Sequence, residues 1–326
     1  MFPVRAPSFT HRSGTNLRIE RRWTDIAGIT LDRVVGVGLD SRGRIYLAHR
    51  GEHPVLRLHP DGSFDREIGA AHLRKSIAYD LRGPVAIPMP LRHWMHGLHI
   101  DARDNLWVTD VSRHLVMKFS PDGELLLTLG TDGIAGCDAA HFSQPTHVCV
   151  LPDGAFFVTD GYGNSRIAKF DANGKFLFAW GGPGTGDGEF HTPHVITLGR
   201  DERLYMTDRE NDRIQVFRTD GTHLVTWPNL HSIDGLIAAP DGFLYGAAGV
   251  DGAILRLDLT GRVLDCWKQP GMVVYPHGIA VAPDGAIYVA ETGDLWQVTG
   301  RLPAERSLLE RAGAERSALT RLARSG

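Results

Sequence analysis

Short runs of apolar or alternating residues recur along most of this chain, and Asp-Gly or Asn-Gly pairs separate many of them. Two neighbouring stretches show the pattern most clearly: 146–160, 164–170 and 173–181, then 204–208, 211–217 and 220–227. Asp-Gly and Asn-Gly are strong signals for hairpin turns, because these turns need positive φ angles. The pattern therefore predicts an all-β protein of short antiparallel strands joined by tight turns.

The predicted strands group into a repeating unit. When the units are aligned, the second strand of each ends at His49, Asp110, Asp160, Asp208, Ala248 and Glu291. Successive positions lie 40 to 61 residues apart, and four-stranded units of this period are typical of propeller blades. The sequence therefore predicts a six-bladed β-propeller.

The last unit is incomplete, with strands expected at 278–281, 286–290 and 295–299 before the repeat ends. Residues 17–23 are predicted to supply the missing outer strand. This closure would join the two ends of the chain in one blade and cover an exposed strand edge.

Two segments lack the repeat. An insertion at about 65–93 is rich in Arg and Pro, and residues 301–326 carry arginines at five-residue steps with leucines that form a modest apolar stripe. The stripe favours a helix packed on the propeller. The predicted organisation is an N-terminal extension (1–16), the propeller (17–300) and a C-terminal helical tail (301–326).

Composition narrows the functional classes. The 326 residues carry a net charge of −3, which gives no electrostatic reason to expect nucleic acid or an anionic membrane as partner. No apolar run has the length of a transmembrane helix, and no signal peptide is visible at the N-terminus. The three cysteines are isolated and odd in number, which suits a reducing compartment. A cytoplasmic protein acting on a small molecule is expected, with its oligomeric state left open.

Each unit has one position that lies fourteen residues before the end of its second strand. Histidine occupies this position in every second unit. The six positions are Val35, His96, Thr146, His194, Asp234 and His277. If six units surround an axis, the three imidazoles converge from directions about 120° apart. Most of the 16 histidines must be incidental, but three in register are hard to ascribe to chance. Three imidazoles without a thiolate leave a coordination position open, as in catalytic zinc sites, so one zinc ion is predicted in the central channel.

Three further residues are predicted to lie at the same end of the channel. Arg50 and Arg209 directly follow the second strand of their units, and Tyr162 follows that of unit three by two positions. In an antiparallel blade, the end of the second strand lies beside the start of the first, where the histidines are. Two guanidiniums suit an anionic substrate, and a tyrosine near a cation can act as a general base. The alternatives are a salt bridge for each arginine and simple packing for Tyr162.

Other recurring polar residues are explained by the repeat itself. We expect Asp110, Asp160 and Asp208 to cap turns, and Arg166 and Arg213 to brace adjacent blades. Asp234 stands apart, because it belongs to the same ring of positions as the histidines. It could be a fourth ligand, an acceptor for an imidazole N–H, or only a polar residue of the channel.

At these residues the chain resembles the peptidylglycine α-hydroxyglycine α-amidating lyases. The resemblance runs from about Val35 to Val298 and rests on 49–53, 96–98, 107–111, His114, 141–146, 160–166, 193–194, 208–215 and 276–277. The underlying repeat is of the NHL type, which binding scaffolds share. The resemblance implies a six-bladed propeller with zinc on His96, His194 and His277, Tyr162 as the base, and Arg50 and Arg209 in substrate handling. It further implies cleavage of a carbinolamide N–C bond to an amide and glyoxylate.

The chain also departs from the family pattern. Gly278 replaces the carboxylate associated with a structural calcium, so no calcium site is expected, and Tyr275 replaces a methionine. Gly163 and Ser143 stand where family cysteines form disulfides. We expect no copper-dependent hydroxylating domain before the propeller and therefore expect a substrate other than a secreted peptide, such as another N-acyl or N-carbamoyl hemiaminal.

Two other classes of function remain open at this stage. A metal-dependent hydrolase, such as a lactonase, could use the same site through a metal-bound water of lowered pKa. The protein could also be a non-catalytic NHL interaction scaffold, which tight binding of one metal ion would contradict.

Overall fold

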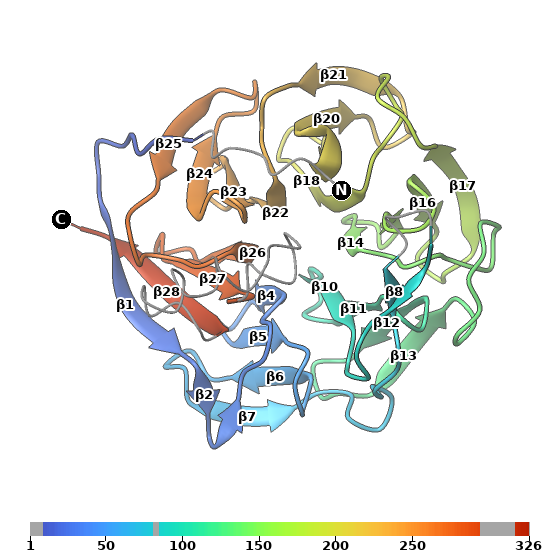
Figure 1. Ribbon diagram of the computed structural model, residues 1–326, viewed down its shortest axis with the longest axis horizontal. Helices are drawn as coiled ribbons and strands as arrows, with labels where there is room; N and C mark the ends of the chain where they lie inside the picture. Colours follow the sequence, from blue (N-terminus) through green and yellow to red (C-terminus); the bar gives the residue numbers. More distant parts are fainter. Residues whose placement is uncertain (1–8, 81–84, 294–316, 326) are drawn as a thin grey trace.

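The computed structural model describes residues 9–80, 85–293 and 317–325. These residues form six four-stranded antiparallel sheets arranged as blades around a central channel, as Figure 1 shows. The predicted six-bladed propeller is confirmed. Within the described part of the chain, no helix has the length and hydropathy needed to cross a membrane.

Five blades are built from four consecutive strands each, with the first strand at the channel and the fourth at the rim (Figure 1). Blade one contains β4 (Gly36–Leu39), β5 (Ile45–Ala48), β6 (Val55–Leu58) and β7 (Phe64–Glu67). Blade two contains β10 (Met95–Ile100), β11 (Leu106–Asp110), β12 (Leu115–Phe119) and β13 (Leu125–Leu129). Blade three contains β14 (His147–Val150), β15 (Phe156–Asp160), β16 (Arg166–Phe170) and β17 (Phe176–Gly181).

Blades four and five follow the same order. Blade four contains β18 (Pro193–Leu198), β19 (Leu204–Asp208), β20 (Arg213–Phe217) and β21 (His223–Trp227), with the short 3-10 helix η1 (Arg209–Asn211) after β19. Blade five contains β22 (Ile233–Ala238), β23 (Leu244–Ala248), β24 (Ala253–Leu257) and β25 (Val263–Trp267). The blades bury apolar side chains on both faces, because each blade packs between two neighbours.

Blade six joins the two ends of the chain. Its order is β26 (Pro276–Val281), β27 (Ile287–Glu291), β28 (Ala318–Arg324) and β1 (Leu17–Trp23). The outer strand predicted from residues 17–23 is therefore present. It pairs antiparallel with β28, from Leu17 opposite Arg324 to Trp23 opposite Leu319.

The predicted helical tail is wrong at its end, where residues 318–324 form a strand. Leu319 and Leu322 are three residues apart, a spacing that suggests one face of a helix. In the strand, the same spacing puts them on opposite faces, where they join two different apolar clusters. Both faces are buried because the blade lies between blades five and one. The predicted strand at 295–299 and the tail residues 301–316 lie outside the described residues.

Two small hairpins stand outside the blades. One comprises β2 (Asp25–Ile26) and β3 (Ile29–Thr30), and the other β8 (Tyr79–Asp80) and β9 (Ile87–Pro88). The second lies in the predicted insertion. The insertion begins later than predicted, because residues 64–67 form the outer strand of blade one.

Candidate active site

The three alternate-blade histidines converge in the channel. His96, His194 and His277 each offer a ring nitrogen within 4.8 Å of the others, and their ring centroids are 4.6 to 5.1 Å apart. All three side chains are buried. The pairing register of β10, β18 and β26 with the next strand shifts at each histidine. Such bulges redirect a side chain, and here they turn the imidazoles toward the axis.

Backbone carbonyls of the intervening blades fix the tautomer of each imidazole. The Nδ1–H groups of His96, His194 and His277 donate to the carbonyl oxygens of Thr146, Asp234 and Val35, at 2.8, 2.7 and 2.7 Å. A carbonyl only accepts, so the proton is on Nδ1 and the lone pair of each Nε2 is left for a ligand. The ring of six positions thus contains three histidine side chains and the three backbone groups that orient them.

Electrostatics keep the triad neutral. Burial is the main cause that lowers the pKa values of His96 and His194 well below the usual range, and it lowers that of His277 to about 3. Nearby Arg50 and Arg209 act in the same direction. Three convergent neutral nitrogens with oriented lone pairs fit a divalent metal such as zinc.

Tyr162 lies directly over the triad. Its hydroxyl is 2.8 Å from Nε2 of His96 and 3.2 Å from Nε2 of His194. The residue follows β15, whose end lies at this face of the ring because the blades are antiparallel. The register shows the same arrangement in blades two and four, where Met95 pairs with Asp110 and Pro193 with Asp208. The predicted proximity of Tyr162 to the histidines is therefore found.

Arg209 links the tyrosine to Asp234. Its Nη1 donates to the Asp234 carboxylate at 3.1 Å and to the Tyr162 hydroxyl at 3.4 Å, while Nη2 donates to Glu210 at 2.8 Å. Burial raises the pKa of Asp234 to about 6, although Arg209 opposes the shift. Asp234 thus orients the site in two ways: its carboxylate holds Arg209, and its backbone oxygen accepts the proton of His194.

Arg50 approaches the pocket from blade one. Its Nε donates to the carbonyl of Met95 at 3.2 Å, and its guanidinium lies 4.6 Å from the ring centroid of Trp94. Burial lowers the pKa of Arg50 to about 10. The turn that carries Arg50 is fixed by buried His49, whose Nδ1 accepts from the backbone N–H of Gly51 at 3.3 Å.

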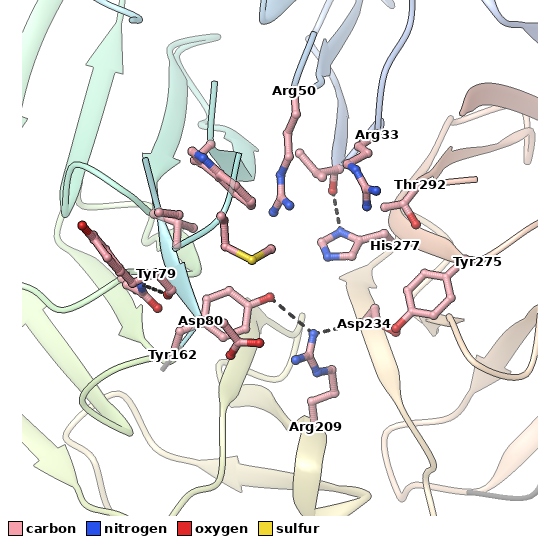
Figure 2. Close-up of a pocket in the computed structure, with 16 residues that line it drawn as sticks. Arg33, Arg50, Tyr79, Asp80, Tyr162, Arg209, Asp234, Tyr275, His277 and Thr292 are labelled. Carbon is pink, nitrogen blue, oxygen red and sulfur yellow. Dashed lines mark hydrogen bonds and ion pairs between the residues drawn. The ribbon is translucent and has the colours of Figure 1, made fainter. Parts of the chain in front are cut away.

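Arg50, Tyr162, Arg209, Asp234 and His277 line a cavity of about 120 Å³. Figure 2 shows Arg50 and Arg209 reaching into it from opposite sides, near Tyr162 and His277. Sequence reasoning missed six polar residues of the lining as site residues: Arg33, Tyr79, Asp80, Gln144, Tyr275 and Thr292. Thr292 follows the second strand of its blade, as Arg50 and Arg209 do, so the alignment contained a signal for it. Arg33, Gln144 and Tyr275 each lie two residues before the ring position of their unit, which is Val35, Thr146 or His277, so the alignment contained a signal for them as well.

The aspartates and arginines that recur with the repeat hold loops of the propeller in place, as predicted. Asp160 accepts from the backbone N–H of Ser143 at 2.8 Å and from Arg166 at 3.0 Å. Asp208 accepts from the N–H of His191 at 2.6 Å and from Arg213 at 2.7 Å. Asp110 accepts from Ser112 and from the N–H of Arg113. Arg166 and Arg213 also donate to carbonyls of the loop that leads in from the preceding blade.

Comparison with known proteins agrees with the architecture. Residues 142–170, most of blade three, match the NHL repeat family. A solved structure titled "Streptogramin B lyase structure" aligns with a TM-score of 0.59 over 84% of this chain and 80% of that one. Its 19% sequence identity supports the fold alone. The protein is thus an NHL-repeat propeller with a histidine-lined channel.

Sequence relatives define the family. The chain is 32% identical to the probable peptidyl-alpha-hydroxyglycine alpha-amidating lyase pgal-1 of Caenorhabditis elegans, over 80% of each chain. It is 34% identical to the peptidyl-glycine alpha-amidating monooxygenase of Mus musculus, over 87% of this chain but only 32% of that protein. The chain therefore spans about a third of the mouse protein. It belongs to the peptidyl-α-hydroxyglycine α-amidating lyase family.

Proposed function

We propose that this protein is a zinc-dependent lyase that cleaves the N–C bond of a carbinolamide bearing a carboxylate. One observation carries the proposal: the Tyr162 hydroxyl lies within hydrogen-bonding distance of two histidines of the triad, in a cavity that two arginines enter. A base, a metal-type ligand set and anion-binding groups thus converge on one small volume. Names of relatives in the family support the same chemistry.

The reaction needs one proton transfer in each direction and no added water. With Tyr162 as phenolate, its oxygen takes the proton of the substrate hydroxyl. The O–H electron pair forms a C=O bond, and the C–N bond breaks with its electrons moving to nitrogen. The proton then passes from Tyr162 to the departing nitrogen. An N-acyl-α-hydroxyglycine yields a primary amide and glyoxylate, with atoms and charges balanced.

Each residue has a distinct part in this scheme. A zinc ion held by His96, His194 and His277 would supply Lewis acidity, which makes a nearby hydroxyl more acidic. Arg209 donates to the Tyr162 oxygen at 3.4 Å and positions it beside the triad. Arg50 and Arg209, on opposite sides of the cavity, supply positive charge that suits the substrate carboxylate.

The proposed setting is the cytoplasm. Cys137, Cys149 and Cys266 are free thiols, and free thiols suit a reducing compartment. Ser143 and Gly163, which stand where the family has disulfide-bonded cysteines, offer no thiol. They lie in contact, and the N–H of Gly163 donates to the Ser143 carbonyl at 3.0 Å. An intracellular N-acyl hemiaminal fits this setting better than a secreted peptide does.

Product analysis tests the function. Zinc-loaded protein incubated with N-acetyl-α-hydroxyglycine should release acetamide and glyoxylate in equal amounts, and Tyr162→Phe should not. A lactone panel serves as the competing assay. Opening of a lactone without any carbinolamide cleavage would assign the site to hydrolysis instead.

A further inference from the structure

Five of the six units bend the backbone sharply just before the histidine ring. Two residues before the ring position, φ lies between 45° and 64° in every unit except blade two, where Trp94 stands. The five residues are Arg33, Gln144, Thr192, Ser232 and Tyr275. Few residues other than glycine adopt such left-handed angles. Four of the six residues at this position line the active-site cavity: Arg33, Trp94, Gln144 and Tyr275.

A backbone hydrogen bond accompanies this position in blades two to six. The carbonyl of the residue accepts from an N–H of the turn that follows the second strand of the same blade. In blade six, Thr292 donates to the Tyr275 carbonyl at 3.3 Å, and the same bond holds the turns that carry Tyr162 and Arg209. The repeat thus accounts for the backbone at this position, whereas the side chain differs from blade to blade.

The Tyr275 hydroxyl is a buried polar group that the protein does not satisfy. The residue is 4% exposed and lines the cavity, yet its hydroxyl has no hydrogen-bond partner among residues 9–80, 85–293 and 317–325. At the same position of their units, Gln144 donates to the Tyr79 carbonyl and Ser232 to the Asp234 carboxylate. Because an unpaired buried hydroxyl is unfavourable, the Tyr275 hydroxyl indicates that a ligand supplies its partner.

Thr292 repeats the observation in the same blade. Its Oγ1 is also buried with no hydrogen-bond partner in the described part of the chain, and the residue lines the same cavity. Figure 2 shows Tyr275 and Thr292 beside the histidine of their own blade, His277. Blade six therefore places two hydroxyl groups, both able to donate, next to one member of the triad.

The surrounding charges favour an anion as the partner of these hydroxyls. Arg50 enters the cavity from blade one, the neighbour of blade six, and no carboxylate of the described residues forms an ion pair with it. Asp234 is close to Tyr275, since a Cβ on Gly249 would lie 2.2 Å from Oδ2 of Asp234 and 2.8 Å from Cε1 of Tyr275. Arg209 already binds the Asp234 carboxylate at 3.1 Å. A carboxylate has only acceptor atoms, so Arg50 and the hydroxyls complement it.

We propose that Tyr275 donates a hydrogen bond to the substrate carboxylate and thereby selects anionic over neutral carbinolamides. This inference rests on the proposed lyase function and places the carboxylate at the wall formed by blades one and six. Arg50 supplies the positive charge there, and Tyr275 supplies a directed donor, with Thr292 beside it. Tyr275 thus binds the substrate, whereas Tyr162 acts as the base.

Removing only the hydroxyl tests this role. In Tyr275→Phe, KM for N-acetyl-α-hydroxyglycine should rise at least about tenfold while kcat stays within about twofold, because a hydrogen bond to a charged group is lost from substrate binding. Cleavage of the neutral N-acetyl-α-hydroxyglycinamide should not change. The matched control is Tyr46→Phe, because Tyr46 is also fully buried but packs in an apolar cluster away from the cavity lining. This control should keep both parameters for both substrates.

The outcomes separate the hydroxyl from the chemistry. An unchanged KM, equal losses on both substrates, or a wild-type preference for the neutral substrate would overturn the proposal and leave the lyase function standing. If wild type cleaves neither substrate, the lyase proposal fails, and calorimetry of zinc-loaded protein with glycolate against glycolamide then decides about the carboxylate site. Glycolate binding that Tyr275→Phe weakens about tenfold would retain the site. Absence of glycolate binding, or equal binding by the variant, would reject it.

Discussion

The two ends of the channel are built from the same first strands and differ sharply in chemistry. The active-site end has arginines, tyrosines and two carboxylates, most of them contributed by turns and by the insertion. The far end is a second cavity of about 210 Å³, lined mainly by glycines and aliphatic residues, with His99 and His147 among them. Val35, Asp234 and His277 line both cavities, so the histidine ring is the partition.

The comparison shows which hydrogen bond leaves a buried histidine free to bind a metal through Nε2. Each triad imidazole has Nδ1 bonded to a carbonyl of the next blade, which leaves Nε2 for a metal. In the far cavity, Nδ1 of His147 is buried without a hydrogen-bond partner, and the nearest ring, that of His99, is 6.3 Å away. Burial lowers the pKa of His147 to about 3. Burial and neutrality are thus common to both ends, whereas the Nδ1 hydrogen bond to a carbonyl and the convergence of three rings distinguish the triad.

The largest expected effect follows from removing the triad. The variant with His96→Ala, His194→Ala and His277→Ala should bind no zinc and lose all measurable cleavage. It should still fold, because these side chains lie in the channel and not in the blade cores. Metal analysis and circular dichroism measure the two properties. His147→Gln is the control from the far cavity and should keep both metal and activity. Full metal occupancy in the triple variant would contradict the assignment.

The next largest effect concerns Tyr162. Tyr162→Phe should lower kcat by roughly 10²- to 10⁴-fold, because the base that takes the substrate hydroxyl's proton is lost. Metal content should change little, since the three histidines remain. Stopped-flow or glyoxylate-release assays on zinc-loaded protein measure the rate. A fully active variant would remove Tyr162 from the mechanism.

The arginines should produce a smaller, substrate-dependent effect. Arg50→Ala and Arg209→Ala should each reduce kcat/KM for a carboxylate-bearing carbinolamide by roughly 10- to 100-fold, the range of a lost charge-assisted hydrogen bond. A neutral amide analogue should be affected much less. Equal losses on both substrates would mean that the arginines shape the site or polarise Tyr162 without binding a carboxylate.

Aligning the repeats correctly predicted the residues that occupy equivalent positions in different blades. His96, His194 and His277 share one position in the unit, so their convergence followed from counting residues, and Arg50, Arg209 and Tyr162 followed from the antiparallel order of strands. Segments without the repeat gave no such guide. Ala78, Tyr79, Asp80 and Met89 belong to the insertion, which occurs once in the chain, and their place in the cavity depends on the tertiary fold.

The error at the C-terminus has a related cause. Residues 318–324 pair with strands distant in the chain, β27 and β1, and only this pairing decides between helix and strand. The outer strand at 17–23 was predicted because an incomplete blade leaves an edge to cover. The same argument could have been applied to 318–324, since the leucine spacing fits a strand buried on both faces equally well.

A histidine at the active-site end should also set the response of stability to acid. Burial lowers the pKa of His49 to about 4 in the native state. The unfolded chain takes up a proton as the pH falls below about 6.5, whereas native His49 does not until about 4. Stability present above pH 6.5 is therefore lost progressively down to pH 4, by about 3 kcal/mol from this residue. Urea unfolding at pH 7 and pH 4.5 should show a smaller acid loss for His49→Gln than for wild type, and an equal loss would disprove the contribution.

The smallest expected effect is at the far end of the channel, where we predict no calcium dependence. Gly278 lines the far cavity and has no side chain to offer a ligand. A Cβ at this position would lie 2.9 Å from the Val35 carbonyl oxygen, which already accepts the Nδ1 proton of His277. A carboxylate here would therefore press on the group that orients a triad histidine. The thermal midpoint of zinc-loaded protein should not change when a calcium-selective chelator is added. A large fall that calcium alone reverses would show that another carboxylate, with Asp234 the nearest in the ring, binds the ion, and the far end of the channel would then hold a metal as well.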